Sequence, residues 1–144
     1  MTHIQQRVEH ELRARDDIEL RLGATLVHLP IVRSVAVNIA MRADFDLDAI
    51  SDLEMAVDES CSSLITRAVE NSILVARFTL RADEIVFTAS VTSHDATAPS
   101  TTTFGWRVLT TLADAAVSWV EPDAGGRFHL VHIELSKRRP VVEG

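Results

Sequence analysis

The spacing of apolar residues changes near the middle of this 144-residue chain, and the order of the change constrains the fold. Before residue 70, two long segments carry apolar residues at helical spacing. After that point, apolar and β-branched residues form short paired segments separated by turn-forming residues. Helices followed by hairpins are typical of an α+β protein whose helices pack on one face of a mostly antiparallel sheet. We therefore expect a two-layer α/β sandwich.

One strand and two helices are expected in the first half. Residues 18–22, IELRL, alternate apolar and charged side chains, which predicts a strand with one solvated face. An apolar segment then begins at Pro30 and extends to about Ala43, and proline is tolerated in the first turn of a helix. Asp48 is the expected N-cap of the next helix. The apolar residues of that helix recur at helical spacing and are Ile50, Leu53, Val57, Leu64 and Ala68.

Two hairpins and a third helix are expected in the second half. Residues 72–82 and 84–92 are rich in apolar and β-branched side chains, with turn-forming residues where they meet, which predicts an antiparallel hairpin. Residues 104–114 are long enough for a helix. A second hairpin is expected to join residues 115–120 to residues 127–135 through the turn sequence EPDAGG.

A single domain is expected at residues 18–136. Residues 1–17 are highly charged with weak apolar periodicity, and residues 137–144 combine a basic cluster with a proline, so we expect both ends to be flexible. The first residues lack the apolar core of a signal peptide, and no stretch approaches the ~18 unbroken apolar residues of a membrane span. We expect neither export nor membrane insertion.

The charge and the cysteine content restrict the partners and the compartment. The chain has 14 Lys and Arg against 21 Asp and Glu, which gives a formal net charge of −7. Such a surface repels phosphate backbones and anionic lipid headgroups, so we expect a basic protein partner and neither direct nucleic-acid binding nor a membrane. Cys61 is the only cysteine, which excludes an internal disulfide and a cysteine-rich zinc site and favours a cytoplasmic location.

Two polar clusters do not require a chemical role. His129 and His132 are three residues apart on an expected strand, which places them on opposite faces and argues against a shared metal ion. Ser93, His94 and Asp95 are neighbours in sequence, whereas a catalytic triad brings its members together through the fold. We interpret this second cluster as a polar loop.

Glu59 and Ser63 form a stronger candidate site. Four residues of helix place both side chains on one face, turned away from the apolar stripe of Val57 and Leu64. Two outcomes stay open: the pair projects into a shared pocket, or it forms part of an ordinary solvated face. Cys61 lies beside the apolar stripe and is expected to be a small core residue.

The order of the elements and the segment AVDESCSS at residues 56–63 resemble the anti-sigma-factor serine kinases of bacteria, which belong to the GHKL superfamily with histidine kinases and gyrase. The resemblance extends from about Ile18 to Leu135 and includes the late helix that begins FGWRVL at Phe104. It implies a GHKL (histidine-kinase-like ATPase) fold with a mostly antiparallel mixed sheet. In that family the corresponding helix reads roughly AVSEAxTN, in which Glu is the general base and Asn holds magnesium between the ATP phosphates.

Three nucleotide-binding motifs of this family are changed here. The chain keeps Glu59 but has Ser63 in place of Asn, and a hydroxyl is a weaker magnesium ligand than an amide carbonyl. The DxGxG motif that reads adenine is replaced by SVTSHDATA, which has no glycine and places Asp95 a few residues past the expected Asp. The phosphate-binding GxGxG motif becomes TFGWRV, with Thr103 and a single Gly105. The resemblance therefore implies weak or absent binding of ATP and magnesium, with no cofactor required.

The resemblance also implies a function. It indicates an anti-sigma factor that binds and inhibits an alternative RNA polymerase sigma factor in a stress-response partner switch and is released by an anti-anti-sigma antagonist of the STAS type. Family members act as homodimers. Two alternatives stay open: an active serine kinase that phosphorylates the antagonist with Glu59 as base, and a degenerate ATPase-like scaffold that binds another regulator.

Arg33 is the candidate residue for partner contact. It matches a family arginine in the first helix that touches both the sigma factor and the antagonist, and it lies 30 residues before Ser63, as the family arginine lies before its Asn. We expect Arg33 to be exposed, on the side of the helix that is not used for the core. Ile31, Val35 and Ile39 are expected to face the core. The alternative is an ordinary arginine on the solvated side of a helix.

Overall fold

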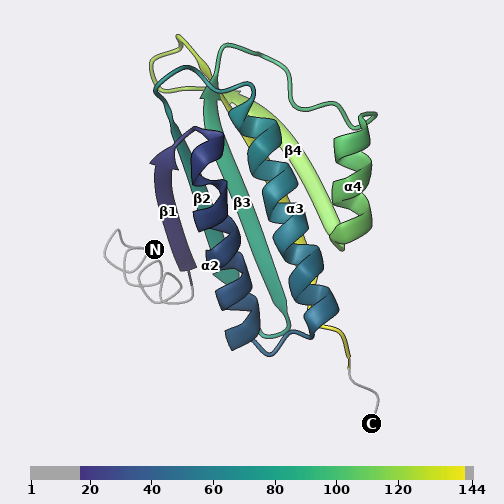
Figure 1. Cartoon of the computed structure of the whole chain (residues 1–144). Helices are drawn as coiled ribbons and strands as arrows, with labels where there is room; N and C mark the ends of the chain where they lie inside the picture. Colours follow the sequence, from purple (N-terminus) through teal and green to yellow (C-terminus); the bar gives the residue numbers. More distant parts are fainter. Residues whose placement is uncertain (1–16, 142–144) are drawn as a thin grey trace, which may run out of the picture.

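Residues 17–141 of the chain, as described by a computed structural model, form one five-stranded sheet with helices on one face (Figure 1). The strands are β1 (Asp17–Gly23), β2 (Ile73–Leu80), β3 (Glu84–Ser93), β4 (Ala115–Pro122) and β5 (His129–Arg138). The helices are α2 (Leu29–Arg42), α3 (Leu47–Ile65) and α4 (Phe104–Leu112), and a short 3-10 helix, η1 (Leu26–His28), precedes α2. The expected α+β two-layer architecture is confirmed.

The strand order is β1-β2-β3-β5-β4, and every neighbouring pair of these strands is antiparallel. Both expected hairpins are present. After β3, the chain crosses through α4 to the edge strand β4 and returns through β5, which lies between β3 and β4. This crossover places α4 beside α3, on the β4 side of the sheet (Figure 1).

The N-cap of α3 differs from the sequence expectation. Asp46, not Asp48, caps the helix: its backbone is extended, and its carboxylate accepts a hydrogen bond from the backbone N–H of Ala49 at 2.8 Å. Asp48 lies in the first turn, where the helix dipole favours a carboxylate without a capping bond. The helix also ends at Ile65, so Ala68 lies beyond it and forms an isolated bridge with Ser93.

The core lies between the sheet and the three helices. Phe78 and Phe87 on neighbouring strands pack with ring centroids 4.8 Å apart and their rings tilted by 44°, and Leu53 and Leu64 of α3 are fully buried. Cys61 is also fully buried, as expected. Burial raises the pKa of its thiol to about 12, with a smaller contribution from the negative charge of Asp58, because both disfavour the thiolate.

The ends of the expected domain extend slightly in the structure. Strand β1 begins at Asp17 and β5 continues to Arg138, two residues into the expected tail. There, the Lys137 ammonium donates hydrogen bonds to an Asp52 carboxylate oxygen at 3.2 Å and to the Leu112 carbonyl at 2.9 Å. The expectation of flexibility for residues 1–16 and 142–144 lies outside the described residues. Within residues 17–141, no helix has the length and hydropathy needed to cross a bilayer.

Candidate functional site

Helix α3 forms one wall of two cavities, one on each side. Toward α4, Glu59 and Ser63 line a cavity of about 340 Å³ together with Thr103 and Gly105 of the α4 N-terminal region; we call it the α3–α4 pocket. Toward α2, Glu54 lines a second cavity of about 420 Å³, which we call the α2–α3 groove. The two candidate functions predicted from the sequence, nucleotide binding and partner contact, therefore fall on opposite sides of one helix.

The α3–α4 pocket is rich in hydroxyl groups. The side chains that contribute them are Ser62, Ser63, Thr66, Ser100 and Thr103. The Thr103 hydroxyl caps α4, because it accepts a hydrogen bond from the backbone N–H of Trp106 at 3.2 Å. This cap fixes the start of α4 at the pocket wall.

Glu59 and Gly105 are in direct contact across this pocket. A Cβ atom built on Gly105 would clash with Glu59 Oε1 and would lie 3.3 Å from Glu59 Cδ. A side chain at this position would therefore require the Glu59 carboxylate to move, which the flexible end of a half-exposed glutamate can do at low cost. The Glu59 carboxylate lies against the first turn of α4, where the helix dipole favours a negative charge.

This contact gives a prediction for Gly105→Ala. We expect the substitution to lower the free energy of unfolding by no more than about 1 kcal/mol, because the new methyl group displaces only the flexible end of the Glu59 side chain. Denaturant unfolding measures the change. In a Glu59→Ala background, the same substitution should instead be neutral or stabilising by up to about 1 kcal/mol, since alanine favours a helix over glycine. Equal destabilisation in both backgrounds would show that the Glu59–Gly105 contact is not its cause.

Asp95 does not line the α3–α4 pocket. It lies exposed in the loop after β3, where its backbone N–H donates to the Ser93 hydroxyl at 3.0 Å, and that hydroxyl donates to the Arg67 carbonyl at 2.7 Å. The structure thus brings together Glu59, Ser63, Thr103 and Gly105, but not the residue expected at the adenine position.

The pocket fits a magnesium nucleotide poorly. Among the described lining residues Glu59 is the only charged side chain, so the pocket offers no lysine or arginine to the phosphates of a nucleotide. The Glu59 carboxylate itself lies at the N-terminus of α4, where a phosphate would need positive potential. Within residues 17–141, no three His, Cys, Asp or Glu side chains are grouped so as to hold a metal ion.

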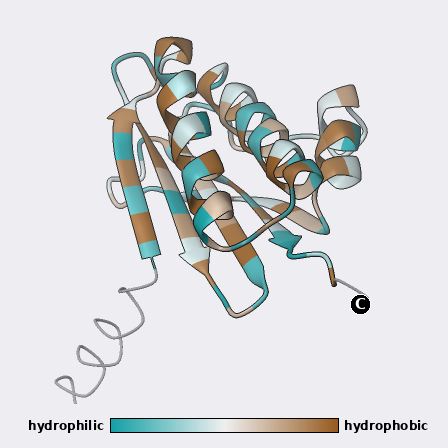
Figure 2. Ribbon diagram, turned by 60° about the horizontal axis from the view of Figure 1, so that its bottom comes forward, coloured by the Kyte–Doolittle hydropathy of each residue, from teal (hydrophilic) through white to brown (hydrophobic). Residues whose placement is uncertain are grey.

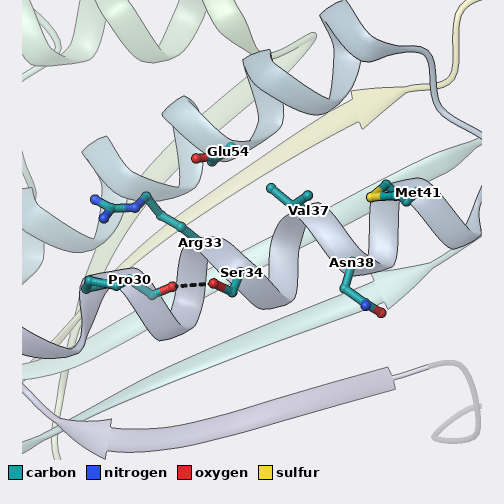
Figure 3. Close-up of a pocket in the computed structure, with 7 residues that line it drawn as sticks. All are labelled: Pro30, Arg33, Ser34, Val37, Asn38, Met41 and Glu54. Carbon is teal, nitrogen blue, oxygen red and sulfur yellow. Dashed lines mark hydrogen bonds between the residues drawn. The ribbon is translucent and has the colours of Figure 1, made fainter.

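The α2–α3 groove contains Arg33, as Figure 3 shows. The Arg33 guanidinium donates a hydrogen bond to Asp58 Oδ1 at 2.8 Å, and both side chains are half-exposed, at 37% and 35%. Asp58 lies one turn after Glu54 on α3, so these two carboxylates line the side of α3 that faces α2. The guanidinium is therefore held in place by Asp58 and remains accessible from solvent.

Two apolar side chains of α2, Val37 and Met41, line this groove, and Met41 is largely exposed. The expectation that Ile31 faces the core is wrong, since it is 49% exposed. The α2 residues that are buried against the sheet and α3 are Leu29, Val32, Ala36, Ile39 and Ala40.

Asp58, Glu54 and Met41 were not singled out from the sequence. The i, i+4 spacing of Glu54 and Asp58 is a signal that could have placed two carboxylates on one helix face. Nothing local pointed to the Arg33–Asp58 ion pair, because its members are 25 residues apart on different helices.

Fold and cavities together define a class of protein: a two-layer α+β domain with one antiparallel sheet, consistent with a GHKL-like fold. No family model matches the chain. The chain is 37% identical over 127 residues to the anti-sigma-F factor RsbW of Mycobacterium tuberculosis, in both strain CDC 1551 / Oshkosh and strain ATCC 25618 / H37Rv. The matched region covers 85% of this chain and 73% of that protein. The chain therefore belongs to the anti-sigma factor family.

Proposed function

We propose that this chain binds an alternative sigma factor of RNA polymerase, holds it inactive, and is released by an anti-anti-sigma antagonist of the STAS type. The observation that carries this proposal is the 37% identity to anti-sigma-F factor RsbW across most of the chain. The sigma factor is the inhibited partner, the antagonist is the releasing partner, and a homodimer is the acting form. These partners define a cytoplasmic partner switch of the stress-response kind.

The α2–α3 groove is the proposed contact surface. Arginine is enriched among the residues that dominate binding energy at protein interfaces, and such residues lie in packed surroundings that exclude water. Arg33 offers a guanidinium that Asp58 holds in position and that is 37% exposed, so a partner seated on the groove can cover it and exclude water. A carboxylate on the sigma factor or on the antagonist can share or replace the Asp58 contact.

Capture from the native host tests this proposal. The tagged chain should retain a sigma factor, identified by mass spectrometry of the bound proteins. Repeated recovery of a different regulator without any sigma factor would favour the scaffold alternative.

The acidity of the chain gives a prediction for association kinetics. A net charge of −7 should accelerate encounter with basic regions of a sigma factor, and salt screens this attraction over roughly 8 Å at physiological ionic strength. We therefore expect the association rate constant, measured by stopped-flow fluorescence, to fall as salt rises from 50 to 500 mM. An association rate that does not change over this series would show that electrostatic steering does not speed the encounter.

The serine-kinase alternative has one observation in its favour. Glu59 and Ser63 line the same pocket as Thr103 and Gly105, which is the arrangement a nucleotide site of this family would use. The close contact of Glu59 with Gly105 and the exposed position of Asp95 weigh against it. We propose that the domain acts by binding, without a required cofactor, and that any interaction with ATP and magnesium is weak.

A further inference from the structure

The open face of the sheet, which we define as the side away from the helices, has two halves of different charge. On β1 this face carries Asp17, Glu19 and Arg21, and Arg77 of β2 lies 4.0 Å from the Asp17 carboxylate and 3.7 Å from that of Glu19. The two acidic and two basic side chains balance, so the β1–β2 half carries no net charge. Figure 2 shows the alternation of hydrophilic and hydrophobic residues along β1.

The β4–β5 half of the open face is acidic. The β5 residues buried toward the helices are Val131, Ile133 and Leu135. Glu134 alternates with them and therefore lies on the open face, and the pairing of β4 with β5 places Glu121 there too. Arg138, at the end of β5, pairs with Glu84 of β3 at 3.8 Å. In the described part of the chain, no lysine or arginine forms an ion pair with Glu121 or Glu134.

Trp119 lies between these two carboxylates. Glu121 follows it by two residues on β4, and Glu134 pairs with the residue two positions before it. The indole ring stacks on the imidazole of His132, with ring centroids 4.7 Å apart and an interplanar angle of 20°. His132 is fixed by hydrogen bonds with the Ser90 hydroxyl at 2.6 Å and with Glu121 Oε1 at 2.8 Å. The other face of the indole points away from His132, and β4 is an edge strand of the described sheet, so that ring face is open to solvent and Trp119 is 37% exposed.

A free aromatic face flanked by carboxylates fits an arginine side chain. The guanidinium group is planar and always charged, stacks on indole rings and pairs with carboxylates. Both carboxylates can be reached from solvent: the Glu121 side chain is 53% exposed, and Glu134 lines a cavity of about 250 Å³ beside Val117. Trp119 is already ordered, so it loses little conformational entropy when a ligand stacks on it.

We propose that Trp119, Glu121 and Glu134, which we call the acidic–aromatic patch, bind an arginine in a basic segment of the sigma factor. This second contact rests on the proposed function and lies on the opposite side of the sheet from the α2–α3 groove. A sigma factor that recognises a promoter needs lysine and arginine side chains to contact DNA phosphates. Such a basic surface is complementary to a chain of net charge −7 and to the carboxylates of the patch. An arginine held on the patch cannot contact a phosphate, so this contact also hinders DNA binding.

Two short peptides test the patch on the full chain. Tetra-arginine and tetra-lysine, each amidated and labelled with fluorescein at the N-terminus, carry equal charge, but arginine stacks better on an indole ring. We expect the wild-type chain to bind tetra-arginine about three- to fivefold more tightly than tetra-lysine, measured by fluorescence anisotropy. Trp119→Leu should remove this preference, and Glu134→Gln should weaken tetra-arginine binding. Glu70→Gln is the control with the same charge change, at an exposed turn before β2, and should leave binding unchanged. Equal wild-type affinities for the two peptides would overturn the patch.

Affinity for the sigma factor captured from the native host separates the patch from the proposed function. By biolayer interferometry, we expect Trp119→Leu and Glu134→Gln each to raise the dissociation constant about threefold or more, and Glu70→Gln to leave it unchanged. If both patch variants bind the sigma factor as tightly as the wild type does, the patch is overturned and the proposed function stands. If the wild-type chain binds no sigma factor, the proposed function is overturned and with it the assigned ligand of the patch.

Discussion

Arg33→Glu is expected to reduce affinity for the sigma factor and for the antagonist by more than thirtyfold. Removal of an arginine at the centre of an interface commonly costs 2 kcal/mol or more, which is roughly thirtyfold in the dissociation constant, and Arg33→Ala should show this loss. Arg33→Glu should lose more affinity than Arg33→Ala, because glutamate adds repulsion toward a partner carboxylate and toward Asp58, which lies 2.8 Å from the native guanidinium.

Folding should be affected far less than binding. The Arg33–Asp58 pair is half-exposed, and ion pairs of this kind contribute about 0–1 kcal/mol to stability. Arg42→Glu is the matched control: it lies on the same helix, is exposed, makes the same change in net charge and does not line the groove. Affinities can be measured by biolayer interferometry, alongside the melting temperature of each variant. Equal affinities for a folded Arg33→Glu variant and for the wild type would place the interface elsewhere.

Binding of ATP is expected to be absent or weaker than a dissociation constant of about 1 mM. Transfer of a phosphoryl group depends on a metal, a phosphate cradle and a positioned base. The chain has Ser63 where the family has the magnesium-binding asparagine, and Gly105 is the one glycine of its phosphate motif. Residues 90–98 contain no glycine, Asp95 is exposed outside the pocket, and the Glu59 carboxylate contacts Gly105 at the start of α4. Isothermal titration calorimetry with and without magnesium measures the affinity directly.

A dissociation constant in the low micromolar range, equivalent to a binding free energy of about 8 kcal/mol, would contradict this expectation and favour the kinase alternative. Glu59→Ala then distinguishes the two roles of the carboxylate. If Glu59 acts as a general base, the variant retains ATP binding but loses phosphorylation of the antagonist, because the base acts on the attacking hydroxyl. If binding itself is lost, Glu59 has a structural role in the pocket.

The periodicity of apolar residues was sufficient to predict the helices and hairpins. The alternation in IELRL predicted β1, and the spacing of Leu53, Val57 and Leu64 predicted the buried side of α3. The N-cap was misassigned because Asp46 and Asp48 are equally good capping residues by type, and only the extended backbone at Asp46 decides between them.

The buried side of α2 was harder to predict. Most of α2 is apolar around its circumference, so the pattern alone does not determine whether Ile31 or Val32 faces the core. The structure buries Val32 and exposes Ile31. The exposure of Ile31 is a property of the packed helices that local sequence does not encode.

The candidate sites depended on contacts between residues distant in sequence. Helical spacing correctly placed Glu59 and Ser63 on one face of α3, and the structure adds that both line a pocket with Gly105. The contact of Glu59 with Gly105 spans 46 residues, and the Arg33–Asp58 pair spans 25. Such contacts are fixed by how the helices pack on the sheet, and a single sequence contains no local pattern that predicts them.

Transcription in vitro tests the central claim most directly. RNA polymerase holoenzyme is reconstituted with the sigma factor captured from the native host, and single-round transcripts from a promoter of that sigma factor are measured as the purified chain is added. We predict that inhibition approaches completion near equimolar amounts of chain and sigma factor, and that Arg42→Glu inhibits equally while Arg33→Glu does not. Undiminished transcription at a tenfold molar excess of the wild-type chain would contradict its function as an anti-sigma factor.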